Sequence, residues 1–103
     1  MAAIELTSAN FEEEIKGAGI ALVDFWAVWC GPCQMQGPVI EELAETRSDI
    51  KVCKVNVDQE AALAAKFQVM NIPSLVFFKN GEPVKKEVGF HSLEEIEDIL
   101  KAL

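Results

Sequence analysis

The chain is predicted to fold as an α/β protein around a mixed β-sheet, and two features of the sequence support this. Segments expected as strands alternate with segments of helical hydrophobic period, and a two-residue turn signal then separates two final strands. Strands joined through helices pair in parallel, whereas a hairpin pairs antiparallel, so helices cover both faces of a mixed sheet. The expected order is β-α-β-α-β-α-β-β-α. The 103 residues contain no linker, repeat or low-complexity tract, so we expect one domain over residues 1–103.

The first two strands and helices follow from hydrophobic pattern and capping residues. A short strand is expected around residues 3–6, and Ser8 or Asn10 is a candidate cap for the helix that follows. Residues 20–27 are almost continuously apolar, as expected for a strand that is buried on both faces. Residues 35–47 have a helical period, with apolar side chains on one face and glutamates on the other.

The next strand and helix are shorter. Residues 50–57 alternate between apolar and polar positions, which predicts a strand. Asp58 can cap a helix over residues 60–67, whose apolar face consists mostly of alanine. The small side chains allow this helix to pack closely against the sheet.

A hairpin and a capped helix end the chain. Strands are expected over residues 74–79 and 83–88, on either side of Asn80-Gly81, a pair typical of a type I′ turn. Ser92 and Glu95 have the spacing of a capping box, and the residues after them place one apolar stripe on the last helix.

Composition excludes several classes of function. The net charge of −8 opposes binding to nucleic acid or to anionic membranes. The acidic residues gather on expected helix faces, which indicates solvent-exposed surface at Glu12-Glu13-Glu14, Glu41-Glu42, Glu45, Glu94-Glu95 and Glu97-Asp98. No apolar run approaches the length of a membrane span, and the first residues lack the pattern of a secretory signal. With three cysteines and no such signal, we expect the reducing cytoplasm.

Two cysteines separated by Gly31 and Pro32 are the most informative feature of the chain. Cys30 and Cys33 lie where an expected strand passes into an expected helix. At that point, unpaired backbone N–H groups and the positive end of the helix dipole favour a thiolate over a thiol. The two sulfurs fall on one side of the first turn, close enough to bond to each other. This arrangement predicts a reversible two-electron switch between dithiol and disulfide.

A structural zinc site and a permanent disulfide are weaker interpretations of the cysteine pair. Half of a structural zinc site needs two more ligands, and the chain offers only Cys53 and His91, neither of them in a second pair of that spacing. A permanent disulfide belongs to small, loop-rich secreted domains, whereas 50% of these residues are hydrophobic and can form a core. We therefore expect no metal. Because no phosphate-binding glycine loop is present either, we expect no bound cofactor, and the switch must draw its electrons from another molecule.

A lone carboxylate, Asp24, lies within the apolar segment of residues 20–27. Burial of a carboxylate is costly and raises its pKa toward neutrality. The residues alone leave two interpretations open. Asp24 is either a structural residue satisfied by neighbouring hydrogen bonds or a proton acceptor for Cys33, acting through water.

From end to end, the chain resembles the thioredoxin family. The matching segments are Val23-Asp24-Phe25-Trp26-Ala27, Trp29-Cys30-Gly31-Pro32-Cys33, Pro38, Asn56-Val57-Asp58, Ile72-Pro73, Phe78-Lys79-Asn80-Gly81 and Val88-Gly89. The resemblance implies the thioredoxin fold, a central five-stranded mixed sheet flanked by four helices. It also implies a reductant of protein disulfides, because oxidising relatives usually carry a histidine between the cysteines and this chain has Gly-Pro.

The resemblance implies a role for each residue of the cysteine site. Cys30 would be the exposed nucleophile and Cys33 the shielded resolving cysteine, supported by Trp29 and by Gly31-Pro32. Pro32 suits the first turn of a helix, because it has no N–H to leave unpaired. Asp24 would be the proton acceptor, with Lys54 near it. For Lys54, an ordinary position on the strand surface is an equal alternative.

The resemblance also implies a groove that binds substrate. A cis Ile72–Pro73 bond would face the cysteines and leave the preceding backbone free to pair with an extended substrate strand. The apolar rim of the groove would consist of Trp29, Ile72, Pro73, Gly89 and Phe90. For Phe90, and for Trp26, packing in the core is the default alternative to a place at the site.

The expected partners are a thioredoxin reductase, which restores the dithiol, and disulfide-containing target proteins; we expect a monomer.

Gln34 departs from the family, because thioredoxins commonly carry lysine there, and it removes a positive charge beside the thiolate. Cys53 is expected to be an inert buried thiol and His91 a surface residue.

The rival function is a binding module, a thioredoxin fold retained as a structural subunit or folding helper. The intact cysteine pair, together with Asp24 and Pro73, argues against it.

Overall fold

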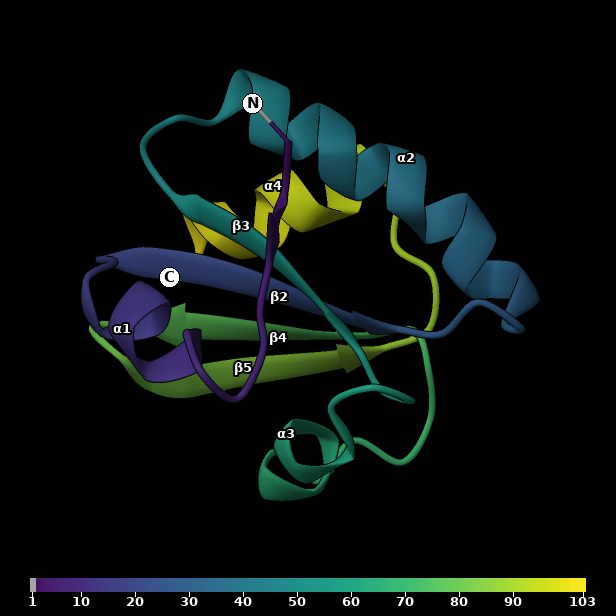
Figure 1. Cartoon of the computed structure of the whole chain (residues 1–103). Helices are drawn as coiled ribbons and strands as arrows, with labels where there is room; N and C mark the ends of the chain where they lie inside the picture. Colours follow the sequence, from purple (N-terminus) through teal and green to yellow (C-terminus); the bar gives the residue numbers. More distant parts are fainter. Residues whose placement is uncertain (1) are drawn as a thin grey trace.

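The computed structural model describes residues 2–103 of the chain (Figure 1). Over these residues, five strands and four helices follow one another in the expected order: β1 (Ile4–Glu5), α1 (Phe11–Lys16), β2 (Ile20–Trp26), α2 (Gly31–Thr46), β3 (Lys51–Asn56), α3 (Ala61–Lys66), β4 (Ser74–Lys79), β5 (Glu82–Val88) and α4 (Leu93–Lys101). The strands form one sheet in the order β1-β3-β2-β4-β5. β1, β3 and β2 run parallel, and β4 and β5 are antiparallel to their neighbours. The predicted fold class is confirmed.

Helices cover the two faces of the sheet in pairs, and each pair has its own core cluster. Figure 1 shows α2 and α4 on one face and α1 and α3 on the other. Because side chains alternate along a strand, β2 serves both faces: Val23 and Phe25 pack with α1 and α3, and Leu22 packs with α2 and α4. This explains why the segment is continuously apolar. Asp24, two residues after Leu22, takes the α2 side of the sheet.

Helix α2 begins earlier than its hydrophobic period indicates. The apolar pattern starts at Met35, whereas the helix starts at Gly31 with Cys30 as its N-cap. The N–H of Cys33 donates to Cys30 Sγ over 3.2 Å, and Pro32 occupies the first turn, where it displaces no intrahelical hydrogen bond. Both cysteines therefore lie at the helix N-terminus, and Pro38 lies inside the helix as expected.

Short-range signals at the C-terminal end are confirmed. Asn80 and Gly81 have φ values of 52° and 85°, as a type I′ turn requires. Ser92 and Glu95 form the expected capping box on α4.

The predicted cap of α1 is confirmed in position, and the predicted cap of α3 is wrong. Asn10 is the N-cap of α1, although its side chain makes no capping hydrogen bond, because its Oδ1 accepts from the N–H of Thr7 over 2.7 Å. Asp58 does not cap α3, whose N-cap is Glu60. The turn before α3 is held instead by Asn56 Oδ1, which accepts from the N–H of Asp58 over 2.9 Å.

Candidate active site

The cysteine pair forms a disulfide between the N-cap and the first turn of α2. The Cα atoms of Cys30 and Cys33 lie 5.2 Å apart. Cys30 Sγ is 3.7 Å from the carbonyl oxygen of Ile72, and Ile72, Trp26 and Val57 pack against the pair. As a result, the expected exposure of Cys30 is wrong for this state: it is 5% exposed, against 4% for Cys33. The Ile72 segment, distant in sequence, covers the sulfur that the motif alone suggested was open.

Asp24 is buried beneath α2, on the strand that precedes the cysteines. Its Oδ1 is buried and has no hydrogen-bond partner within residues 2–103. The hydrogen bonds that a purely structural aspartate needs are therefore missing at this oxygen. Burial raises the pKa of Asp24 to about 7, although the positive charge of Lys54 opposes this rise. Near neutral pH, Asp24 can both accept and release a proton.

One cavity of about 280 Å³ is lined by both Asp24 and Cys33. Its lining comes from β2, β3 and α2, and consists of Asp24, Trp26, Cys33, Gln34, Gly37, Pro38, Ile40, Glu41 and Lys54. A cavity of this size with several polar groups has room for water. Cys33 and Asp24 thus share a space through which a proton can pass.

Lys54 and Glu41 also line this cavity and carry opposite charges. Lys54 is the partner of Asp24 in the β2–β3 register, and its Nζ lies 3.3 Å from Glu41 Oε2. Glu41 also accepts from the N–H of Ala3 over 2.9 Å. The hydrophobic pattern had placed Glu41 on the solvent face, without a part in the site. The spacing of Cys33, Gly37 and Glu41, four residues apart in turn, was the signal that places them on one side of a helix.

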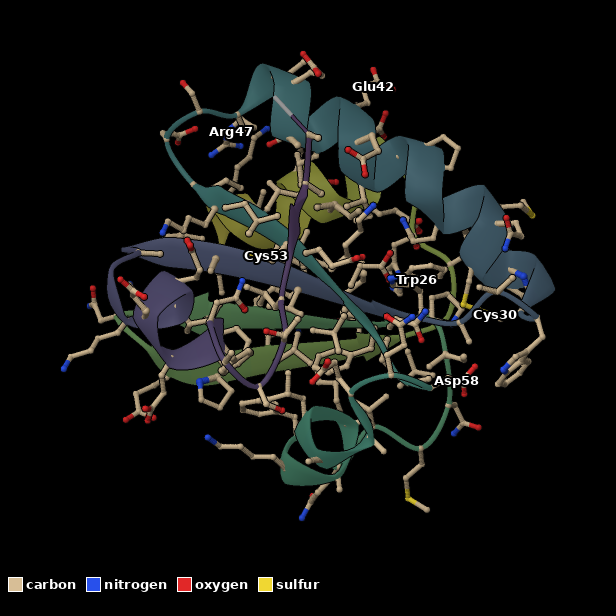
Figure 2. The ribbon with its side chains drawn as sticks, in the orientation of Figure 1. Trp26, Cys30, Glu42, Arg47, Cys53 and Asp58 are labelled. Atoms are coloured by element: carbon tan, nitrogen blue, oxygen red, sulfur yellow. A yellow bond between two sulfur atoms is a disulfide. The ribbon has the colours of Figure 1, made fainter. Side chains whose placement is uncertain are left out.

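Trp29 lies on the surface beside the disulfide and is held in place. It is 71% exposed, and its Nε1 donates to Asp58 Oδ2 over 2.8 Å. Figure 2 shows Trp26, Cys30 and Asp58 toward the same end of the molecule, with Cys53 away from them. The predicted cap residue Asp58 therefore serves the cysteine loop, a partner that its local sequence does not reveal.

The other predicted rim residues come from two loops that meet beside Cys30. The Ile72–Pro73 bond is cis, and the carbonyl of Pro73 accepts from the N–H of Gly89 over 2.8 Å. Gly89 has a φ of +94°, a backbone conformation that favours glycine. Phe90 follows it and is 39% exposed, so the alternative of core packing is wrong for this residue.

Two further residues were expected to lie outside the site. Cys53 is fully buried among side chains of the α1 and α3 face, and burial raises the pKa of its thiol to about 12. The thiol form, which is the less reactive one, is therefore favoured at neutral pH. His91 was expected at the surface, but its ring is mostly covered, and its Nδ1 lies 2.9 Å from the carbonyl oxygen of Gly89.

The molecule shows neither a metal cluster nor a membrane span in the part that is described. Among residues 2–103, no three histidine, cysteine, aspartate or glutamate side chains are grouped so that they could hold a metal ion. Over the same part of the chain, no helix has the length and apolar character needed to cross a membrane.

Comparison with known proteins agrees with the fold and the cysteine pair. The family model described as Thioredoxin matches residues 2–102. A thioredoxin of Staphylococcus haemolyticus is 50% identical over 103 residues, covering 97% of this chain and 96% of that protein. One of Alicyclobacillus acidocaldarius is 47% identical over 97 residues, covering 93% and 92%. The structure of a mutant thioredoxin from Halobacterium salinarum superposes with a TM-score of 0.92 at 35% identity, covering 98% of this chain and 89% of that one.

The match extends over nearly the whole chain, and it includes the paired cysteines at the start of α2. Sequence identity of this extent carries the chemistry of the family as well as its fold. The chain belongs to the thioredoxin family of thiol-disulfide oxidoreductases.

Proposed function

We propose that the chain reduces disulfides in other proteins, with Cys30 as nucleophile and Cys33 as resolving cysteine. The observation that carries this assignment is the position of the two sulfurs. Cys30 is the N-cap and lies against the Ile72 carbonyl, toward the groove, whereas Cys33 is one turn into α2 and lines the cavity that contains Asp24.

The reaction is two successive thiol–disulfide exchanges. The Cys30 thiolate attacks one sulfur of the target disulfide, forms a mixed disulfide and displaces the first target thiolate, which takes up a proton. Cys33 then gives its proton to Asp24 through water and attacks Cys30 Sγ, so that the second target thiolate leaves. Two electrons pass to the target, and the chain is left with the Cys30–Cys33 disulfide.

Neighbouring residues support the pair. Gly31 and Pro32 allow the tight first turn that brings the sulfurs together. Lys54 limits the rise in the pKa of Asp24, so that the carboxyl titrates near neutral pH and not above it.

The target docks against the rim beside Cys30. Trp29 and Phe90 present exposed aromatic surface, and Ile72, cis-Pro73 and Gly89 present backbone. An extended target segment pairs with the Ile72 backbone in the manner of an added strand, which places its disulfide over Cys30.

The chain works in the cytoplasm as a monomer of one domain, without a bound cofactor. A thioredoxin reductase returns electrons to the disulfide after each cycle, and proteins that contain disulfides are the targets. The acidic surface gives no site for nucleic acid or for anionic membranes, in keeping with the net charge of −8.

Trapping of mixed disulfides tests the two roles. Cys33→Ser leaves the nucleophile but no group to resolve the intermediate, so target proteins should accumulate on Cys30. Non-reducing gels of a cell extract incubated with the reduced variant should show bands that dithiothreitol removes. Cys30→Ser is the matched control and should trap few targets; equal trapping by the two variants would reverse the assignment.

A further inference from the structure

Gln36 is a polar side chain in the core of the molecule, three residues after Cys33. It is 0% exposed, and both ends of its amide bond to the backbone of one residue. Its Nε2 donates to the carbonyl oxygen of His91 over 3.0 Å, and the N–H of His91 donates to its Oε1 over 2.8 Å. The side chain thus pairs with His91 as a neighbouring strand would.

The residue that Gln36 holds belongs to the rim loop, defined here as residues 89–91. Within this loop, the ring of His91 contacts the carbonyl of Gly89, and the N–H of Gly89 bonds to the carbonyl of Pro73. Figure 1 shows the connection from β5 to α4 running next to α2. A continuous series of hydrogen bonds therefore joins the helix that carries the cysteines to the loop beside them.

Packing alone does not require glutamine at this position. An apolar side chain of similar size would fill the space, but it would leave the N–H and C=O of His91 without their partner in α2. Gly89, at φ +94°, gives the loop a backbone that is easily moved once its anchor is lost.

We infer that Gln36 is a positioning residue for substrate: it fixes the rim loop relative to Cys30, so that Gly89 and Phe90 meet a docked protein target in one arrangement. This inference rests on the docking groove proposed above. The inference predicts that a change at Gln36 affects the docking of a protein target, which needs the rim loop, and not the sulfur chemistry, which does not need it.

Gln36→Met tests the inference, because methionine keeps the size of the side chain and loses both hydrogen bonds. The loss of two buried hydrogen bonds should lower kcat/KM for a protein disulfide about tenfold, mainly through KM. Reduction of a small aromatic disulfide, which does not reach the rim loop, should stay within about twofold of the unchanged chain. Amide hydrogen exchange at Gly89 and His91 should accelerate.

Two controls distinguish positioning from general loss of stability. Leu43→Ala destabilises the core beneath α2 without touching the rim loop, so it should leave KM for the protein disulfide unchanged. Gln36→Glu restores both hydrogen bonds only when its carboxyl is protonated, because the neutral acid donates and accepts as the amide does. Measured as a ratio to the unchanged chain, its kcat/KM should approach one at acidic pH, where the carboxyl is protonated, and fall as the pH rises and the carboxyl ionises. The ratio removes the pH dependence that the two proteins have in common, and the ionisable side chains in or near the site, Asp24, Cys33, Glu87 and His91, are present in both.

The outcomes separate this inference from the function on which it rests. If Gln36→Met reduces the protein disulfide with unchanged KM while Phe90→Ala raises KM, the inference is wrong and the groove stands. If neither variant changes KM, the groove itself is wrong. A KM that rises equally in Leu43→Ala would reduce Gln36 to a purely structural residue.

Discussion

At the scale of single residues, Asp24 is a carboxyl group buried at a cost in free energy, and its proposed role in proton transfer accounts for that cost. It is buried, its Oδ1 has no partner among the residues described, and its pKa is raised to about 7. Burial of an apolar or amide side chain in this position would cost less free energy. Asp24 shares a cavity with Cys33, which supports the proposed role of the carboxyl as a proton acceptor.

Asp24→Asn should therefore stabilise the protein above neutral pH and slow the resolving step. An unfolded aspartate ionises at about pH 3.9, whereas folded Asp24 keeps its proton to about pH 7. Between these values the folded state binds the extra proton, so its stability falls as pH rises, and the loss is complete above about pH 7. The variant should gain up to about 4 kcal/mol in unfolding free energy at about pH 8 and little at about pH 4.

Urea unfolding at the two pH values measures the stability, and the decay of a preformed mixed disulfide measures the resolving rate. We expect the decay at neutral pH to be at least about tenfold slower in the variant. A variant that is less stable at the higher pH and resolves at the native rate would exclude a buried proton acceptor.

At the scale of elements, helix and turn signals succeeded where the partners are adjacent in sequence. The Asn80-Gly81 turn and the Ser92–Glu95 capping box involve only residues that are close in sequence, so the local sequence determines their geometry. Asn10 is the N-cap of α1 but makes no capping hydrogen bond, because the N–H of Thr7 donates to its Oδ1, and Asp58 does not cap α3. Asp58 bonds to Trp29, and that contact exists only once the chain has folded.

Ser92→Ala should lower the unfolding free energy by about 1 kcal/mol, because it removes the acceptor for the N–H of Glu95 at the start of α4. The backbone N–H of Ser92 is the largest cause of the lowered pKa of Glu95, and the Ser92 side chain adds to it, so the variant should keep the backbone part of this lowering and lose only the side-chain part. Denaturant unfolding and NMR titration check the two effects. Ser48→Ala, in an exposed turn, is the control and should change neither quantity. Equal losses of unfolding free energy in the two variants would show that the capping box does not stabilise the fold.

At the scale of the whole molecule, the order of elements could be predicted and the site's more distant supporting contacts could not. Hydrophobic period and the cysteine motif located the strands, the hairpin and the pair Cys30–Cys33. The contributions of Glu41 and Gln36 depend on segments distant in sequence, since each bonds to a residue more than ten positions away. The residues next to Glu41 and Gln36 in the sequence do not reveal these partners, because Glu41 lies in an acidic run and Gln36 is a single glutamine in an expected helix.

The covering of Cys30 belongs to the same scale. The motif placed this sulfur at an open helix end, but the fold brings the Ile72 segment across it. The surroundings of Cys30 therefore come from both the Ile72 segment and the start of α2, so they depend on the whole fold.

The central claim is that Cys30 and Cys33 together reduce protein disulfides, and insulin reduction tests it most directly. With dithiothreitol as electron donor, the reduced B chain of insulin precipitates, and turbidity records the rate. The unchanged chain should accelerate precipitation well above the rate with dithiothreitol alone, and a folded Cys30→Ser/Cys33→Ser variant should give only that background rate. Equal acceleration by the two proteins would contradict the claim and favour a binding module that needs no redox turnover.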